Sequence, residues 1–304
     1  MCAAPAAGSS APPADGRPGG GARQHWLVHH YCQGTGLADN LRLLCGDISL
    51  EVIDQHSPAW LRDKVVERID EFDRVIVEPT IARRFEQRLQ DRLIVVPTFA
   101  FRGYHPDFFL LRRETGRQFA GPTGSSQSMI AYCAFNAGRT EAETVALYRE
   151  EVYAASGYLD QWSDSREALL ATFRHHGLEL GRDFVGWSRR GPFMHSIIHP
   201  RIACLRDVAR KILEREGLPV FAAEFLPPDI LASREVLPVY PEIARVVGIA
   251  GSYLFKRGDN QRIYDLEEYV ALSFAGFRTA PGATVLPAYA PVLEKVKSAI
   301  ERFS

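Results

Sequence analysis

The stretch WLVHHYCQGTGLADNLRLLCGDISLEVI, residues 26–53, decides the fold class. An apolar, strand-like run at 26–31 leads into a leucine-rich segment with helical spacing at 36–45, and a second strand-like run follows at 48–53. Short strands that alternate with helical segments are typical of βαβ units around a parallel sheet. The stretch therefore predicts an α/β fold.

The same alternation continues to about residue 96. Two further strand-like runs lie at 74–77 and 93–96, and segments with helical spacing near 59–71 and 80–91 precede them. Right-handed crossovers place helices on both faces of such a sheet and open a ligand crevice at the carboxyl ends of the strands. We expect this sheet core to occupy mainly residues 25–110.

The remainder of the chain has mostly helical spacing. The helix-like segments are 127–136, 140–155, 164–176, 264–275 and 290–302. A better-marked helix begins near Pro200 and ends at Gly217. We expect one α/β domain over residues 25–304, with an additional, mostly helical region at about 125–180 and a C-terminal helical and loop region over 200–304.

Charge and composition exclude several classes of protein. The 304 residues carry 36 Lys and Arg against 37 Asp and Glu, a formal net charge of -1, so no positive field is present to hold a nucleic acid. No apolar run reaches the roughly 18 to 20 residues that span a bilayer. The first 24 residues are almost all Ala, Gly, Pro and Ser and lack the apolar core of a signal peptide. We expect them to form a disordered tail, and we expect a cytoplasmic protein.

The five cysteines form no zinc-binding pattern. They are widely spaced and include no CxxC pair. They predict free thiols in a reducing compartment and no metal site. The sequence does not specify the oligomeric state.

Cys32 lies in the first chemically informative motif, HHYCQGTG at 29–36, where a strand ends and a helix begins. Backbone amides and the helix dipole favour a thiolate there and stabilise an oxyanion, so Cys32 is a candidate nucleophile. Gly34 and Gly36 would let a ligand approach the backbone closely, although the last glycine of a dinucleotide fingerprint is missing. The alternative is that Cys32 is a small buried residue in a tight turn.

The second motif, PTFAFRGYHPD at 97–107, follows the fourth strand at the same sheet edge. His105 accepts a proton near neutral pH and is a candidate general base. Asp107 either orients an imidazole or simply starts a turn by bonding local amides. Tyr104 is interpreted mainly as a packing residue.

The third motif, GPFMHSIIHP at 191–200, precedes the well-marked helix. His195 and His199 flank an apolar pair, and either is a candidate to complete a Cys/His site. Nothing in the local sequence chooses between the two histidines.

The three motifs, in this order and spacing, resemble the WcbI family of polysaccharide biosynthesis proteins. The resemblance runs from about Trp26 to Gly217. The family typically has Asn-Cys-Gln at the first motif, Gly-Tyr-His-Pro-Asp at the second and Asn-His-Pro at the third. This chain matches the second motif fully, but it has Tyr31 and Ile198 at the two asparagine positions.

The resemblance implies coenzyme A binding and an architecture similar to SGNH-type acyltransferases and hydrolases. It also implies acetyl transfer from acetyl-CoA to a sugar hydroxyl of a capsular or other polysaccharide precursor. In that scheme His105 or His199 takes a proton, and Cys32 either accepts the acetyl group or lies beside the thioester. The amides of Gln33 and Gly34 would hold the oxyanion.

Further residues are assigned to binding in the same scheme. Tyr104, Asp107 and His195 are candidates for contact with the substrate. The phosphates of coenzyme A need Arg or Lys side chains or helix N-termini. The candidates for the cofactor are Gly36, the pair Arg189 and Arg190, and the pair Lys256 and Arg257.

Two other functions are compatible with these residues. A non-catalytic protein would bind coenzyme A or a glycan intermediate and present it to a partner enzyme, and the loss of both family asparagines favours that alternative. An SGNH-like cysteine esterase would use water as the acceptor. An acetylated sugar as product identifies a transferase, free acetate alone identifies an esterase, and no product identifies a binding protein.

Overall fold

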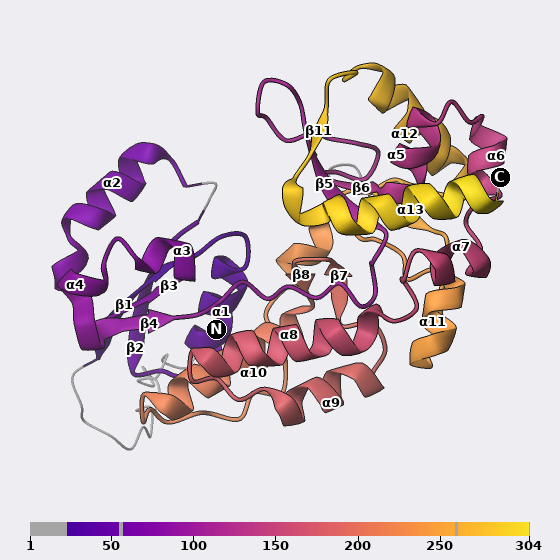
Figure 1. Cartoon of the computed structure of the whole chain (residues 1–304). Coiled ribbons are helices and arrows are strands. Elements are labelled where there is room, and N and C mark those ends of the chain that lie inside the picture. Colours follow the sequence, from indigo (N-terminus) through magenta and orange to yellow (C-terminus); the bar gives the residue numbers. More distant parts are fainter. Residues whose placement is uncertain (1–22, 55–56, 259–260, 304) are drawn as a thin grey trace, which may run out of the picture.

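A four-stranded parallel sheet forms one half of the molecule (Figure 1). The structure, a computed structural model, describes residues 23–54, 57–258 and 261–303. The strands are β1 (Gln24–His29), β2 (Ile48–Ile53), β3 (Arg74–Val77) and β4 (Leu93–Val95). They lie in the order β2-β1-β3-β4, and every pairing is parallel. The predicted parallel sheet in an α/β fold is confirmed, and the bounds of β2 and β3 match the predicted ones.

Helices cover both faces of this sheet, as expected. Successive residues of a strand point to opposite faces, and in β1 both faces are buried. Trp26 and Val28 belong to the core beneath α1 (Gly34–Leu44) and α10 (Ile202–Arg215). Leu27 belongs to a separate cluster formed with α2 (Ala59–Glu67) and the short helices after β3.

The helix expected near 80–91 is broken into two single turns. These are α3 (Pro79–Ala82) and α4 (Glu86–Leu89). Phe85 leaves helical geometry between them and buries its ring in the cluster on that face of the sheet. Gln90 has a φ of 45°, in the left-handed region, and ends α4. Tertiary packing of Phe85 therefore overrides the helical spacing of the sequence.

A second, antiparallel sheet lies in the other half of the molecule. It consists of β5 (Phe108–Arg112), β6 (Ser126–Ser128) and β11 (Thr284–Val285) in the order β11-β5-β6. No strand was expected here from the sequence pattern, and residues 127–128 were expected in a helix; both expectations are wrong. The three polar residues of β6 have no strand-like pattern, and β11 pairs with β5 from a distant part of the chain.

Most of the remaining chain is helical or forms short hairpins. The helices are α5 (Met129–Asn136), α6 (Glu141–Val145), α7 (Glu150–Ala155), α8 (Gln161–His175), α9 (Gly181–Arg189), α11 (Pro241–Val247), α12 (Leu266–Arg278) and α13 (Ala290–Phe303). The hairpin strands are β7 (Met194–Ser196) with β8 (His199–Pro200), and β9 (Phe255–Lys256) with β10 (Ile263–Tyr264). Single 3-10 turns lie at Ile69–Glu71, Gln90–Arg92, Ile230–Ser233 and Pro287–Tyr289. The expected helix at 140–155 is divided between α6 and α7, and α9 and α11 were not expected.

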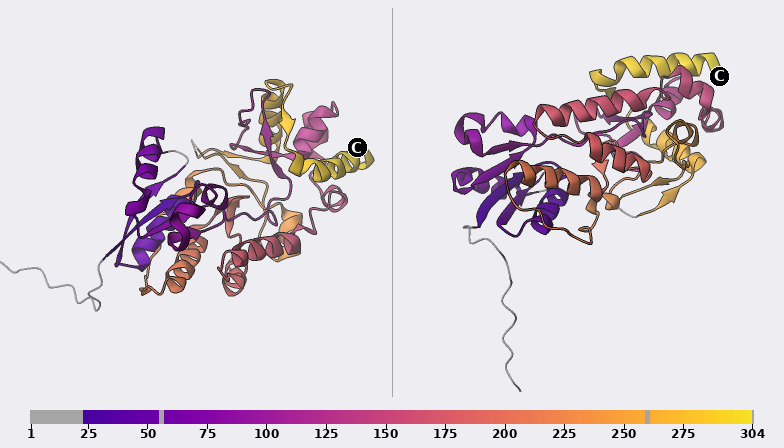
Figure 2. Two further views of the ribbon diagram at one scale, coloured as in Figure 1. Left: turned by 60° about the vertical axis from the view of Figure 1, so that its left-hand side comes forward. Right: turned by 90° about the horizontal axis from the view of Figure 1, so that it is seen from below.

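The two halves share one large hydrophobic core. It extends from Trp26 and Leu41 in the first half to Tyr269 and Val296 in the second. Figure 2 shows the parallel sheet and its helices on one side and the long helix α13 at the far side. The linking elements are the β7–β8 hairpin and α10, which packs along α1.

Three further sequence predictions concern the N-terminal segment, membrane-spanning helices and the cysteines. Of the predicted tail at residues 1–24, residues 1–22 lie outside the described residues, and Gln24 already belongs to β1. Within the described ranges, no helix combines the length and the apolar character that a bilayer span requires. The described cysteines, Cys32, Cys45, Cys133 and Cys204, are all free thiols.

Candidate active site

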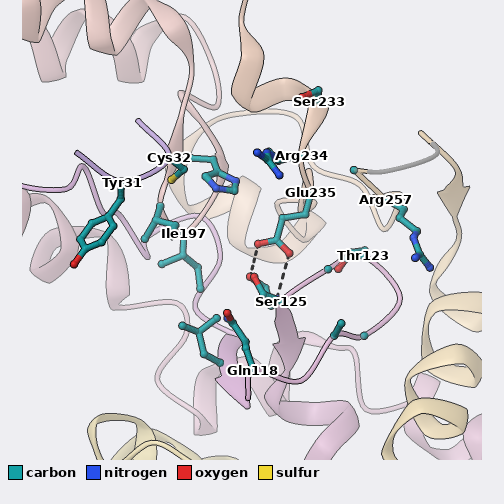
Figure 3. A pocket seen from close by; sticks show the side chains of 18 of the residues that line it. Tyr31, Cys32, Gln118, Thr123, Ser125, Ile197, Ser233, Arg234, Glu235 and Arg257 are labelled. Atoms are coloured by element: carbon teal, nitrogen blue, oxygen red, sulfur yellow. Dashed lines mark hydrogen bonds between the residues drawn. The ribbon is translucent and has the colours of Figure 1, made fainter. Parts of the chain in front are cut away.

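A cavity of about 620 Å³ opens at the carboxyl edge of the parallel sheet, where it faces the antiparallel sheet (Figure 3). Its walls come from the β1–α1 turn, the 118–126 segment, the β7–β8 turn and the segment 233–235. Cys32 and His199 both line it. This is the edge at which the sequence predicted a ligand crevice.

Two neighbouring helices bring Cys32 and His199 together. Cys32 precedes α1 and His199 precedes α10, and the two helices pack side by side. A Cβ atom on Gly36 would lie 2.8 Å from Leu205 Cδ1 and 3.2 Å from Ile202 Cδ1, so the first turns of the helices are in contact. The short segments that lead into the two helices therefore reach the same cavity. Gly36 serves this helix contact, which is a packing role and not the cofactor contact expected.

Burial keeps the Cys32 thiol protonated in the isolated protein. The side chain packs against the apolar cluster of Ile202, Leu205 and Leu231. Burial raises the pKa of Cys32, and the nearby positive charge of Arg234 opposes this rise. A base is therefore needed if this thiol is to act as a nucleophile.

His199 is the histidine that lines the cavity beside Cys32 and is therefore the candidate base. Burial, together with the positive charge of Arg234, lowers the pKa of His199 to about 4. Its Nδ1 is buried and has no hydrogen-bond partner among the described residues, so Nε2 is the ring nitrogen open to the cavity. The imidazole is therefore neutral at pH 7, which is the form that a general base must have before it takes a proton.

Gln33 is buried and joins the three motifs through its side chain. Its Nε2 donates to the carbonyl oxygens of Phe99, at 3.0 Å, and Ile198, at 2.8 Å. Its Oε1 accepts from the Phe99 amide at 2.9 Å. The side chain therefore fixes the backbone on either side of the cavity instead of contacting a substrate.

The two proposed oxyanion donors differ in availability. The Gly34 amide donates to the Tyr31 carbonyl at 2.9 Å, so it is already used within the turn. The Gln33 amide lies close enough to the Cys32 sulfur to stabilise its thiolate form. Of the two, only the Gln33 amide stays a candidate donor.

His105 and Tyr104 lie in the core and do not line the cavity. His105 is 1% exposed, its Nε2 is 3.0 Å from the Leu237 carbonyl oxygen, and burial lowers its pKa to about 3. The Tyr104 hydroxyl donates to the Gly191 carbonyl, and its ring packs against Phe101 and Trp162. The structure therefore places neither residue where it would contact a substrate in this cavity.

Asp107 anchors the interior of the helical half. It accepts hydrogen bonds from the hydroxyls of Tyr158, at 2.9 Å, and Tyr240, at 2.7 Å, and from the Ile130 amide at 3.1 Å. Burial raises its pKa, and these donors oppose the rise. Its side-chain partners are thus two tyrosines and an amide, so of the two roles considered for Asp107 the one that orients an imidazole is not found.

A different carboxylate holds an imidazole next to the cavity. His195 Nε2 is 2.9 Å from Asp229 Oδ2, which also accepts from the Ile202 amide at the first turn of α10. Burial would raise the pKa of Asp229, but its hydrogen bonds to His195 and Ile202 outweigh burial and lower it. His195 does not line the cavity, whereas His199 does. No motif surrounds Asp229, so its role was not predicted from the sequence.

Cationic side chains reach the cavity from an unexpected part of the chain. Arg234 and Arg257 line it, whereas Arg189 lines a separate cavity between α8, α9 and α11. Arg190 lines neither cavity, and Lys256 donates to the Ala232 carbonyl at 2.9 Å. Of the two basic pairs singled out in the sequence, only the second contributes a residue to the site.

A buried glutamate holds the remaining wall in place. Glu235 accepts from the Ser126 hydroxyl at 2.6 Å and from its amide at 3.2 Å. Burial raises the pKa of Glu235. Gly124, at a φ of 146°, lies so close that a Cβ there would be 2.8 Å from Glu235 Oε2. This wall also presents the buried Thr123 hydroxyl, which has no hydrogen-bond partner among the described residues.

The sequence model of the WcbI family, described as the polysaccharide biosynthesis enzyme WcbI, matches residues 25–220. This chain belongs to the WcbI family. The match includes all three motifs and confirms the resemblance inferred from them. Arg234 and Arg257 lie beyond the matched residues, so the WcbI motifs gave no signal for them.

The WcbI fold itself extends over nearly the whole chain. A solved structure described as WcbI, a novel polysaccharide biosynthesis enzyme, aligns with a TM-score of 0.66 at 16% sequence identity, over 93% of this chain and all 100% of that one. It is further described as the native protein without a disulfide bond between coenzyme A and one of its cysteines. At this identity the likeness shows a shared fold. No curated protein matches the chain.

Proposed function

We propose that this WcbI-family protein is a coenzyme A-binding acyltransferase that moves an acyl group, such as acetyl, to a sugar hydroxyl in capsular or other polysaccharide biosynthesis. One observation carries the proposal: Cys32 and a neutral His199 line one cavity in a member of a polysaccharide biosynthesis family. The position of Cys32 directly after the first strand also supports an SGNH-like core. Because coenzyme A thioesters are made inside the cell, the proposed site of action is the cytoplasm.

The polar wall of the cavity suits the phosphates of coenzyme A. Arg234 and Arg257 supply positive charge, and the buried Thr123 hydroxyl supplies an unused hydrogen-bonding group. Phosphates bind Arg side chains through strong, charge-assisted hydrogen bonds. We therefore assign phosphate binding to Arg234 and Arg257 and withdraw it from Arg189 and Arg190.

His199 moves the proton in the proposed transfer. Acyl-CoA supplies an activated thioester. His199 accepts the proton of a sugar hydroxyl as the hydroxyl oxygen bonds to the acyl carbon, and the bond from that carbon to the coenzyme A sulfur breaks. His199 then returns the proton to the departing sulfur, so the products are a sugar ester and free coenzyme A.

Cys32 lies beside the reacting thioester in this scheme. The solved relative is described as the native protein without a disulfide bond between coenzyme A and one of its cysteines. We take Cys32 as the corresponding cysteine and place the coenzyme A sulfur next to it. The Gln33 amide beside the Cys32 sulfur would then stabilise the developing oxyanion.

Product analysis tests the proposal. Protein is incubated with acetyl-CoA and a panel of free hexoses, and both released thiol and acetylated sugar are measured. We expect acetylated sugar, and we expect His199→Gln to lower the rate by about 100-fold or more, because a general base contributes that much. Free acetate alone would identify an esterase, and no turnover would identify a binding protein. Either result contradicts the transferase.

A further inference from the structure

The cavity has an apolar wall next to Cys32. Tyr31, in the β1–α1 turn, and Ile198, in the β7–β8 turn, are 40% and 38% exposed, which is high for large apolar side chains that line a cavity. Ile197, Leu110 and Tyr289 continue the same lining. In Figure 3, Tyr31 and Ile197 lie on the Cys32 side.

Hydrogen bonds hold this apolar wall in a fixed shape. Gln33 Nε2 donates to the Ile198 carbonyl at 2.8 Å, and the Phe101 amide donates to the Ile197 carbonyl at 2.8 Å. The Tyr31 hydroxyl is 3.0 Å from Thr80 Oγ1. The exposed side chains therefore stand on an anchored backbone, which favours a built binding surface.

The opposite side of the cavity is polar and charged. Arg234, Glu235 and Ser125 lie there, and Arg257 lies further along (Figure 3). A coenzyme A thioester has charged phosphates at one end and its acyl group at the other. If the phosphates lie at Arg257 and the thioester lies at Cys32 and His199, the acyl group meets the apolar wall.

We propose that this wall, formed by Tyr31, Ile197 and Ile198, binds an acyl chain of medium length, so that the preferred donor carries a longer acyl group than acetyl. The inference rests on the proposed function, because it needs a coenzyme A thioester in the cavity. An acetyl group offers one methyl, which leaves most of this wall in water. A longer chain covers it, and each methylene removed from water strengthens binding by up to about fourfold.

Calorimetric titration of the full chain tests the inference. The ligands are coenzyme A and its acetyl, butyryl, hexanoyl and octanoyl thioesters. We expect hexanoyl-CoA to bind about tenfold or more tightly than acetyl-CoA. In Ile198→Asn and Tyr31→Asn we expect this ratio to fall to about threefold or less, with the affinity for coenzyme A itself unchanged.

A matched control separates the wall from general surface effects. Ile263 is 61% exposed on β10 and does not line the cavity, so Ile263→Asn should keep the wild-type ratio. Unchanged binding of coenzyme A also shows that each variant is folded.

The possible failures are distinguishable. Equal affinities across the acyl series, with coenzyme A still bound, would overturn the inference and leave the proposed function standing. A second failure would be equal affinities for all acyl thioesters together with hexose binding that is weaker in Tyr31→Asn. That result would assign the apolar wall to the sugar acceptor and would also overturn the inference. No binding of any thioester or of coenzyme A would contradict the proposed function as well.

Discussion

Gln33 is the residue that gives the spacing of the three motifs a structural meaning. Its side-chain amide forms hydrogen bonds to the backbone of Phe99 and Ile198, which lie far from it in the sequence. The sequence identified Gln33 only as a possible oxyanion donor, because a hydrogen bond to a distant backbone leaves no local pattern. Its burial shows that it positions the walls of the cavity.

Replacement of Gln33 should destabilise the protein. Gln33→Ala removes three hydrogen bonds and leaves buried backbone groups unpaired, so we expect the free energy of unfolding to fall by about 3 kcal/mol. Urea denaturation measures this. Asn136→Ala removes one exposed side-chain bond to the Tyr132 carbonyl and should cost about 1 kcal/mol or less. Equal losses in the two variants would contradict the positioning role.

Loss of the Cys32 thiol should reduce turnover much less than loss of the His199 imidazole. Burial raises the pKa of Cys32, and a coenzyme A thioester is already activated, so direct transfer needs only the base and the oxyanion donor. We expect Cys32→Ala and Cys32→Ser to keep turnover within about tenfold of wild type, whereas His199→Gln loses about 100-fold or more. Thiol release from acetyl-CoA measures both. An acylated Cys32 in the quenched enzyme, with turnover lost in Cys32→Ala, would show covalent catalysis instead.

At the scale of elements, the sequence predicted the parallel sheet well and the antiparallel sheet not at all. β3 is apolar and mostly buried, whereas β2 is an edge strand in which Ile48 and Ile53 are buried. The helix α2 separates the two strands in the sequence. By contrast, β6 is Ser126–Ser128, three polar residues whose strand geometry comes from pairing with β5. The local sequence pattern predicts a strand or helix when the buried residues repeat with the period of that element. It fails where pairing with a strand from a distant part of the chain determines the backbone geometry.

The contact between α1 and α10 is the element-scale feature that assembles the site. A Cβ on Gly36 would overlap Leu205, so Gly36→Ala should push the helices apart and cost about 1 to 3 kcal/mol in unfolding free energy. Gly186 lies within α9 with open space around its Cβ position, so Gly186→Ala should be neutral or stabilising by up to about 1 kcal/mol. Thermal unfolding and activity measure both variants. Similar behaviour of the two would contradict the close helix contact.

At the scale of the whole molecule, several buried histidines link stability to pH. Burial lowers the pKa of His105 to about 3, and of His29 and His199 to about 4, from an ordinary value of 6.5. Because the unfolded chain binds more protons than the folded one below pH 6.5, these histidines make stability fall as the pH falls from 6.5 toward 3 to 4. Burial raises the pKa values of Asp107 and Glu235, so these two carboxyl groups make stability rise as the pH falls.

A single substitution isolates the histidine contribution. In His105→Gln the side-chain amide is still able to donate to the Leu237 carbonyl, but it does not titrate. We expect its melting temperature to fall less than that of wild type between pH 6.5 and pH 4. Parallel curves for the two proteins would contradict a neutral, buried His105.

The candidate site was predictable in part for the same reason as the fold. Cys32 follows a clear strand and precedes a clear helix, so its place at the sheet edge follows from local sequence. His105 has an equally suggestive motif, yet its segment turns into the core. Arg234 and Asp229 come from an irregular stretch between α10 and α11, where no periodicity indicates what they face.

The central claim is that the cavity with Cys32 and His199 binds coenzyme A through cations at its polar wall. Calorimetric titration of coenzyme A into the wild-type protein, Arg257→Ala and the double variant Arg189→Ala with Arg190→Ala tests it most directly. We predict binding by wild type, an affinity lower by about tenfold or more in Arg257→Ala, and no change in the double variant. Absence of binding to wild type, or loss of affinity only in the double variant, would contradict the account.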